Sequence, residues 1–235
     1  MVTLHVHRWG LNVFRESLDV DLGLPRVLAK DPWIVEQLLE KGYFRRGGNT
    51  FIRTVTDLPT SFSERATTRP EAAIDILIAP YTSRARDNVR LGDHLTTSEV
   101  PGLATALRRP SVDVELTLVR LNSSVRTTSV MLPDEVSVLI LRAFAWQTRG
   151  KDTDAIDLWR ALEIAYAAGV TFEDLPEADR SQVRDIVWRA FAGRIGSATD
   201  SLLKAQGLFG EGTQRLQARI RALTSAVLGD NPEGV

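Results

Sequence analysis

The chain has 235 residues, of which 43% are hydrophobic and 25% charged, and its 29 basic and 30 acidic side chains give a formal net charge of -1 at pH 7. It contains no cysteine, which excludes disulfide frameworks, cysteine nucleophiles and thiolate metal sites. The near-neutral charge argues against a protein that holds nucleic acid by bulk electrostatics alone. Because no apolar run approaches the length of a membrane span and the N-terminus lacks the order of a signal peptide, we expect a soluble cytoplasmic protein without membrane association.

The sequence has a strand-rich first part and a helical second part. Runs rich in Val, Ile, Leu or Thr, bounded by Gly, Pro or Ser, predict strands at 18–24, 51–55, 73–79, 112–118 and 125–132. Asp31 and Pro32 open a helix that ends at Gly42, with a cap residue followed by proline at the first helical position. Beyond Pro133 the helical spacing predicts helices at about 134–148, 153–168, 177–192 and 199–206, and one starting near 213. We therefore predict an α+β fold, with a mixed-sheet domain at 1–131 and an α-helical domain at 132–235.

An acidic strand is the most distinctive feature of the sequence. Asp19 and Asp21 are two residues apart in a run of otherwise apolar residues, so both carboxylates project to one side of the strand. Two like charges on one face are costly unless a cation or a basic partner lies between them. Mg²⁺ suits this arrangement because it prefers oxygen ligands and keeps positions open for phosphate oxygens. The alternative is an edge strand whose acidic face points into water.

A third carboxylate lies in a later strand. Asp75 is in a run that is apolar on both faces, which indicates a central, buried strand. A lone carboxylate there needs a partner. If this strand lies beside the first one, Asp75 completes a three-carboxylate site that holds two metal ions. The alternative is a residue at a strand end, hydrogen-bonded to a neighbouring loop.

These residues resemble the nucleotidyltransferase fold, and most closely the AbiEii/AbiGii-type nucleotidyltransferases, which occur as toxins in bacterial toxin–antitoxin and phage-defence pairs. The segment Arg15-Glu-Ser17-Leu-Asp19-Val-Asp21 matches the Arg-x-Ser/Thr-x-Asp-hydrophobic-Asp pattern of that family. The strand around Asp75 is similar to the strand that carries its third carboxylate. Two features that follow in the family, a helix with a Lys and a Lys-Asp pair leading into Asp-Leu, resemble the stretch from Pro133 through Arg142 and Lys151 to Asp157.

The chain departs from the family pattern at two points. Arg142 stands where the family usually has Lys, which keeps the charge but changes the geometry of a phosphate contact. The family's Gly-Gly pair is missing, because residues 1–10 resemble the helix that directly follows it. We therefore expect the first strand and its phosphate loop to lie upstream of Met1, through an earlier start codon.

The resemblance implies transfer of a nucleotide from a nucleoside triphosphate to an acceptor hydroxyl or phosphate. Asp19, Asp21 and Asp75 would be the catalytic residues and would bind Mg²⁺, with two ions in the complete site. Arg15, Ser17, Arg142 and Lys151 would contact phosphates, and Asp157 would orient a basic residue or the acceptor. The family also implies an RNA acceptor, particularly the 3′ end of tRNA, and a cognate antitoxin protein as partner.

Several alternatives remain open at this stage. The cluster of Arg149, Lys151, Asp152 and Asp157 can equally be an ion network that joins two helices. The acceptor can be a small molecule, as in aminoglycoside nucleotidyltransferases. A catalytically impaired protein that binds a nucleotide or a partner is a further reading, and an unpaired sheet edge would favour a homo-oligomer. His5 and His7 do not share a helical face, so we expect both on the surface of a helix.

Overall fold

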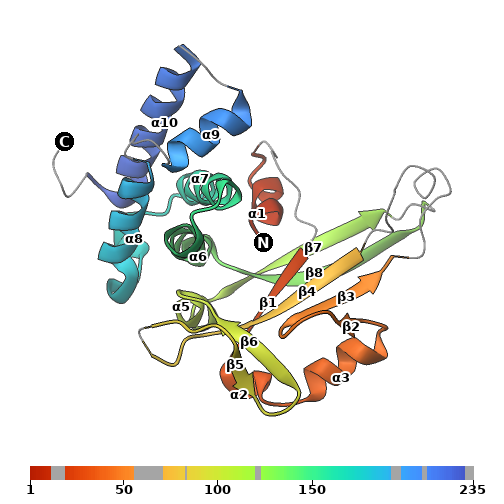
Figure 1. Cartoon of the computed structure of the whole chain (residues 1–235). Helices are drawn as coiled ribbons and strands as arrows, with labels where there is room; N and C mark the ends of the chain where they lie inside the picture. Colours follow the sequence, from red (N-terminus) through yellow and green to blue (C-terminus); the bar gives the residue numbers. More distant parts are fainter. Residues whose placement is uncertain are drawn as a thin grey trace. The chain divides into compact units, whose positions relative to one another are not determined.

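A computed structural model of the chain describes residues 1–11, 19–55, 71–82, 84–119, 123–191, 197–207 and 211–230, with the backbone alone at Asp19 and Val119 (Figure 1). The structure is of the mixed α+β class. It divides into two compact units: Glu16–Leu132 forms a sheet unit, and Met1–Arg15 with Pro133–Val235 forms a helical unit. None of the helices in the described ranges has the length and apolar character that crossing a membrane requires.

The described part of the sheet unit contains a mixed sheet of six strands and a separate pair of strands. The six are β1 (Asp19–Leu24), β2 (Phe44–Arg45), β3 (Thr50–Thr54), β4 (Glu71–Ile78), β5 (Val89–Leu91) and β6 (Leu95–Glu99). They follow the order β2-β3-β4-β6-β5, and β1 pairs with β4 in parallel. The pair is β7 (Ser111–Val119) with β8 (Val125–Pro133). The five strands predicted from the sequence are confirmed, whereas β2, β5 and β6 were not predicted.

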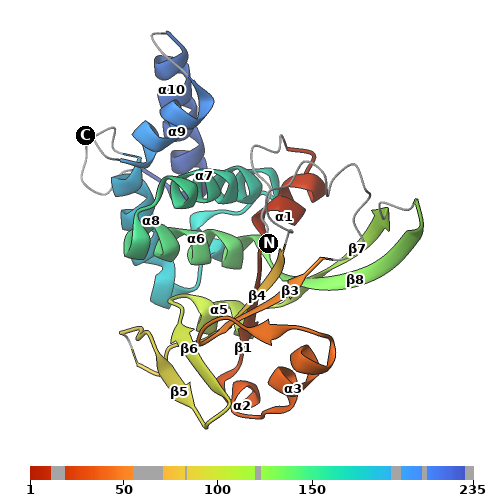
Figure 2. The same cartoon turned by 45° about the vertical axis from the view of Figure 1, so that its right-hand side comes forward.

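A hydrophobic core lies between the sheet and two helices on one of its sides, α2 (Arg26–Ala29) and α3 (Trp33–Glu40) (Figures 1 and 2). Its buried members are Leu24, Ala29, Val35, Leu38, Phe51, Ile76, Ile78, Leu91 and Leu95. Since Ile76 and Ile78 face this core, the alternate positions of β4, including Asp75, face the other side of the sheet. That other side also carries Gly23, which packs closely against Leu103 of α5 (Leu103–Arg108).

The helix predicted between Asp31 and Gly42 is present as α3. The Asp31 carboxylate accepts a hydrogen bond from the backbone N–H of Trp33, at 3.0 Å, which satisfies one of the free donors at the start of α3. The chain leaves the helix through Gly42, whose φ of +79° is in the left-handed region that favours glycine.

The helical unit is organised around a central helix, α7. Its helices are α1 (Val2–Arg8), α6 (Glu135–Arg149), α7 (Asp152–Ala167), α8 (Glu177–Ala190), α9 (Ala198–Gln206) and α10 (Glu211–Leu228), with a 3₁₀ turn at Phe172–Asp174. Helix α7 contacts α1, α6, α9 and α10, so its side chains are buried on several faces. The five helices predicted after Pro133 are confirmed, and Gly169 has the positive φ expected where α7 ends.

The N-terminal helix belongs to the helical unit, although the sequence pattern groups it with the strands. Val2 and Val6 lie in the core formed by α6 and α7. His5, on the same face, is fully buried, and its Nε2 lies 2.8 Å from the carbonyl oxygen of Pro133. The expectation that His5 lies on the helix surface is therefore wrong. The i, i+2 spacing only shows that His5 and His7 differ in face, and His5 has the buried one.

Candidate active site

Two of the three predicted carboxylates are brought together by strand pairing. Strands β1 and β4 run parallel, and Asp21 is the register partner of Asp75. Neighbouring strands lie about 4.8 Å apart, and paired residues project to the same face of a sheet. The two carboxylates therefore lie side by side on the face opposite α2 and α3, which we call the acidic face. The condition set by the sequence, that the strand of Asp75 lies beside that of Asp21, is met.

Asp75 is positioned from the other edge of β4 as well. Thr50 of the antiparallel strand β3 is its register partner there, and the Thr50 hydroxyl donates a hydrogen bond of 2.5 Å to Asp75 Oδ1. The alternative of a strand-end residue bonded to a loop is wrong, because Asp75 lies within β4 and its partner is in a strand. Asp75 is half-buried and Asp21 is exposed, so the pair lies at the surface of the sheet unit.

The remaining predicted residues of this segment are only partly described. Asp19 is the first residue of β1 and pairs with Ala73, two positions before the Asp21–Asp75 pair, and its side chain lies outside the description. Arg15 and Ser17 lie outside the described residues altogether. Among the described side chains, no group of three or more His, Asp or Glu residues is placed to hold a metal ion. The Asp21–Asp75 pair supplies carboxylate oxygens, which are the donors that Mg²⁺ prefers.

The predicted phosphate-binding residues after Pro133 belong to the helical unit. Arg142 of α6 and Asp157 of α7 make an ion pair, with 3.3 Å between Nη1 and Oδ2, and both side chains are largely buried. Lys151 is the exposed residue immediately before α7. Asp157 therefore lies beside a basic side chain, and its expected role in the site stays a prediction.

Neighbouring charges join helices to one another. Arg149 reaches Asp154 through two contacts, 3.1 Å from Nε to Oδ2 and 2.5 Å from Nη2 to Oδ1, and so connects the end of α6 to α7. Asp152 accepts a hydrogen bond of 2.5 Å from the Ser201 hydroxyl of α9. An ion pair that joins two helices is therefore present at Arg149, whereas the contact of Asp152 with α9 is a hydrogen bond from a neutral hydroxyl.

Sequence reasoning did not single out Thr50, whose hydroxyl donates a hydrogen bond to Asp75, one of the candidate metal ligands. Nothing in the sequence marks this threonine, because its hydroxyl comes next to Asp75 only when β3 pairs with β4. The indirect signal was a lone carboxylate in an apolar strand, which requires a polar neighbour.

In comparisons with known proteins, no family model, no curated protein and no solved structure matches this chain.

Proposed function

We propose that the chain is a Mg²⁺-dependent nucleotidyltransferase that moves a nucleotide from a nucleoside triphosphate to an acceptor. The pairing of Asp21 with Asp75 on adjacent parallel strands carries this proposal. It puts two carboxylates on one face, beside the position of Asp19 in the same strand. The order of residues that resembles AbiEii/AbiGii-type nucleotidyltransferases, from Arg15 to Asp157, supports the same function.

The residues of the acidic face would divide the work. Asp19, Asp21 and Asp75 are the residues that would hold Mg²⁺, which when bound supplies positive charge against the phosphates. Asp75 would also help to accept the proton of the attacking hydroxyl. The Thr50 hydroxyl orients Asp75 by donating a hydrogen bond to its Oδ1.

The helical unit would contribute cations for the triphosphate or the acceptor. Lys151 is exposed and can reach phosphate oxygens as a point charge. Arg142 forms an ion pair with Asp157, so it would contact a phosphate while it keeps that pairing. In this proposal the acceptor is RNA, particularly tRNA, the protein acts in the cytoplasm as part of a toxin–antitoxin or phage-defence pair, and an antitoxin restrains it.

The experiment is a transfer assay with radiolabelled nucleoside triphosphates, Mg²⁺ and total tRNA. We expect Asp21→Asn and Asp75→Asn each to reduce labelling of tRNA by at least about a hundredfold, and chelation of Mg²⁺ to abolish it. Asp93→Asn is the matched control, because Asp93 is an exposed aspartate of the same unit that pairs with Arg90 in a turn. A second arm replaces tRNA with an aminoglycoside.

The assay separates the proposal from the alternatives. Labelling of the aminoglycoside alone would move the acceptor from RNA to small molecules. Binding of labelled nucleotide without transfer to either acceptor would contradict the enzyme and favour a binding protein. Equal transfer by Asp21→Asn, Asp75→Asn and Asp93→Asn would remove the acidic face from the mechanism.

A further inference from the structure

The mixed sheet continues past β3 to the short strand β2, which carries an aromatic ring. Phe44 of β2 is the register partner of Ile52 in β3. Phe51 belongs to the hydrophobic core beside α2 and α3, so its neighbour Ile52 projects to the other side of the sheet. Paired residues project to the same side. Phe44 therefore points to the side of Asp21 and Asp75, and lies at the border of the acidic face.

Arg46, two residues further along, has the same orientation. Its backbone N–H donates a hydrogen bond of 3.0 Å to the carbonyl oxygen of Thr50, which continues the pairing of β2 with β3. Its side chain forms an ion pair with Glu71, which alternates with Asp75 along β4 and so projects to the same side. The two charges balance one another, so this pair gives the surface beside Phe44 no net charge.

The register also gives the distance between Phe44 and the carboxylates. Phe44 pairs with Ile52, Ile52 pairs with Ala73, and Ala73 is two residues before Asp75. With strands about 4.8 Å apart and residues of one face about 6.6 Å apart along a strand, the Cα atoms of Phe44 and Asp75 are separated by about 12 Å. Ribose separates the base of a nucleotide from its phosphates. A nucleotide whose phosphates lie at Asp21 and Asp75 can therefore extend its base to the Phe44 ring.

Few aromatic side chains are open to such a contact. Among the described residues, the aromatic side chains exposed by half or more are Trp33, Phe44, Tyr81 and Tyr166. Trp33 begins α3, which packs on the other side of the sheet, Tyr81 follows the end of β4, and Tyr166 belongs to the helical unit. Phe44, at 51% exposure, is the one of these four in a strand on the side of the carboxylates.

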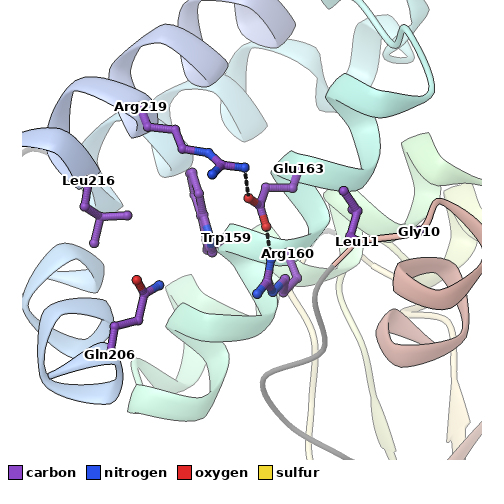
Figure 3. A pocket seen from close by; sticks show the side chains of 8 residues that line it. All are labelled: Gly10, Leu11, Trp159, Arg160, Glu163, Gln206, Leu216 and Arg219. Carbon is purple, nitrogen blue, oxygen red and sulfur yellow. Dashed lines mark hydrogen bonds and ion pairs between the residues drawn. The ribbon is translucent and has the colours of Figure 1, made fainter. Parts of the chain in front are cut away.

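A pocket of the helical unit provides a contrast, because its aromatic ring is already covered (Figure 3). Trp159 is only 2% exposed, and the Arg219 guanidinium lies over its ring, 5.8 Å from the centroid. The Glu163 carboxylate binds both Arg219 and Arg160, which joins these side chains to one another (Figure 3). A flat ligand would have to displace Arg219 to stack on Trp159, whereas half of the Phe44 side chain already faces water.

We propose that Phe44 is a stacking platform for a nucleobase whose phosphate is held at Asp21 and Asp75. This inference rests on the proposed nucleotidyl transfer, because the carboxylates fix the position of the phosphate. An aromatic ring stacks on the flat face of every base, so Phe44 would position the nucleotide without choosing among bases. Both the nucleoside triphosphate and the RNA acceptor carry such a base, and the experiment separates the two.

Binding to the full chain is measured in Mg²⁺ with each of ATP, GTP, CTP and UTP, with total tRNA, and with inorganic tripolyphosphate, which has phosphates but no base. Phe44→Leu keeps an apolar side chain but removes the aromatic ring. It should weaken binding of the nucleoside triphosphates or of tRNA by at least about fivefold, and leave binding of tripolyphosphate unchanged. A loss for the triphosphates assigns the base to the donor, and a loss for tRNA assigns it to the acceptor.

Two further variants make the result specific to the ring. Phe44→Trp should retain the affinity, because it keeps an aromatic face. Trp33→Leu is the matched control, since Trp33 is an exposed aromatic residue of the same unit on the other side of the sheet. If Phe44→Leu binds the triphosphates and tRNA as tightly as Trp33→Leu does, Phe44 is not a platform. An equal loss for tripolyphosphate would show that Phe44 supports the fold of the site and does not contact a base.

The transfer assay distinguishes this inference from the proposed function. Nucleotide transfer by Phe44→Leu with unchanged KM values for both substrates would overturn the platform and leave the transferase standing. Binding that depends on Phe44, without transfer by the unchanged chain, would have the opposite meaning. Failure of the unchanged chain to bind any of these ligands would contradict both.

Discussion

Asp21 and Asp75 are register partners on adjacent parallel strands, and their side chains share one face of the sheet. Two carboxylates placed this close repel one another, so the arrangement is stable only with compensating positive charge or hydrogen bonds. Thr50 supplies one such hydrogen bond, to Asp75 Oδ1, from the opposite edge of β4. The acidic face is therefore built from three strands, β1, β4 and β3.

The contact between Thr50 and Asp75 gives the first prediction. Thr50→Val removes the hydroxyl but keeps a β-branched side chain, so β3 should still form. If Asp75 acts in nucleotide transfer, loss of the bond that orients it should lower the transfer rate about tenfold, and the free energy of unfolding should fall by about 1–2 kcal/mol.

Thr54→Val is the matched control for that variant. Thr54 lies at the other end of β3, where it is the register partner of Glu71, not Asp75. Transfer rates and the Mg²⁺ dependence of each variant should be measured together. If Thr50→Val and Thr54→Val have the same rate, Thr50 does not position a catalytic carboxylate.

A glycine pair in the loop before β3 gives the second prediction. A Cβ atom at Gly48 would lie 2.8 Å from the backbone oxygen of Thr96 in β6, whereas one at Gly47 would meet nothing within 4 Å. Gly48→Ala should therefore destabilise the protein by about 1–3 kcal/mol, because the backbone of β6 cannot move aside cheaply. Gly47→Ala should change stability by less than about 0.5 kcal/mol. Urea unfolding measures both, and equal stability would show that the loop shifts to accommodate the methyl group.

The sequence predicted the elements of the acidic face but not all of its contacts. The strands of Asp21 and Asp75 are dense apolar runs bounded by breakers, which is the pattern that single-sequence reasoning reads best. Their adjacency remained conditional, because pairing between distant segments depends on the whole fold. The Thr50 contact depends on that same tertiary context. So do the strands β5 and β6, which were not predicted; they are short and are joined by a turn around Gly92.

A buried carboxylate in the sheet unit gives the third prediction. Glu99 accepts hydrogen bonds from the Arg86 guanidinium, at 3.2 and 3.3 Å, and from the Arg86 backbone N–H, at 3.0 Å, and it also binds Arg26. Burial raises the pKa of Glu99, but the hydrogen bonds from Arg86 and from the backbone of Tyr81 outweigh that effect and bring it below its ordinary value of 4.5. Glu99 therefore stabilises the fold above pH 4.5, and this contribution is lost as the pH falls below that value.

Replacing Glu99 should expose this dependence. Glu99→Gln removes the carboxylate of two arginines that water can still solvate and should cost about 1–3 kcal/mol. Glu71→Gln is the control, because Glu71 makes a more exposed pair with Arg46 and should cost less than about 1 kcal/mol. Unfolding free energies from pH 3 to 7 test both statements. A Glu99→Gln protein with the same acid sensitivity as the unchanged chain would show that another group controls it.

His5 provides the last prediction, a pH dependence near neutrality. Burial lowers the pKa of His5 below 6.5, with a further lowering from Arg8, and the hydrogen bond to Pro133 and the charge of Glu135 only partly oppose this. As the pH falls through 6.5, the unfolded chain binds a proton at His5 before the folded chain does. Stability should therefore decrease from pH 7 downward until the folded protein is protonated as well.

His5→Gln should flatten this slope, whatever its effect on absolute stability, and His7→Gln, at an exposed position of the same helix, should keep it. Unchanged slopes in both variants, measured by urea unfolding between pH 5 and 8, would exclude His5 as the group responsible.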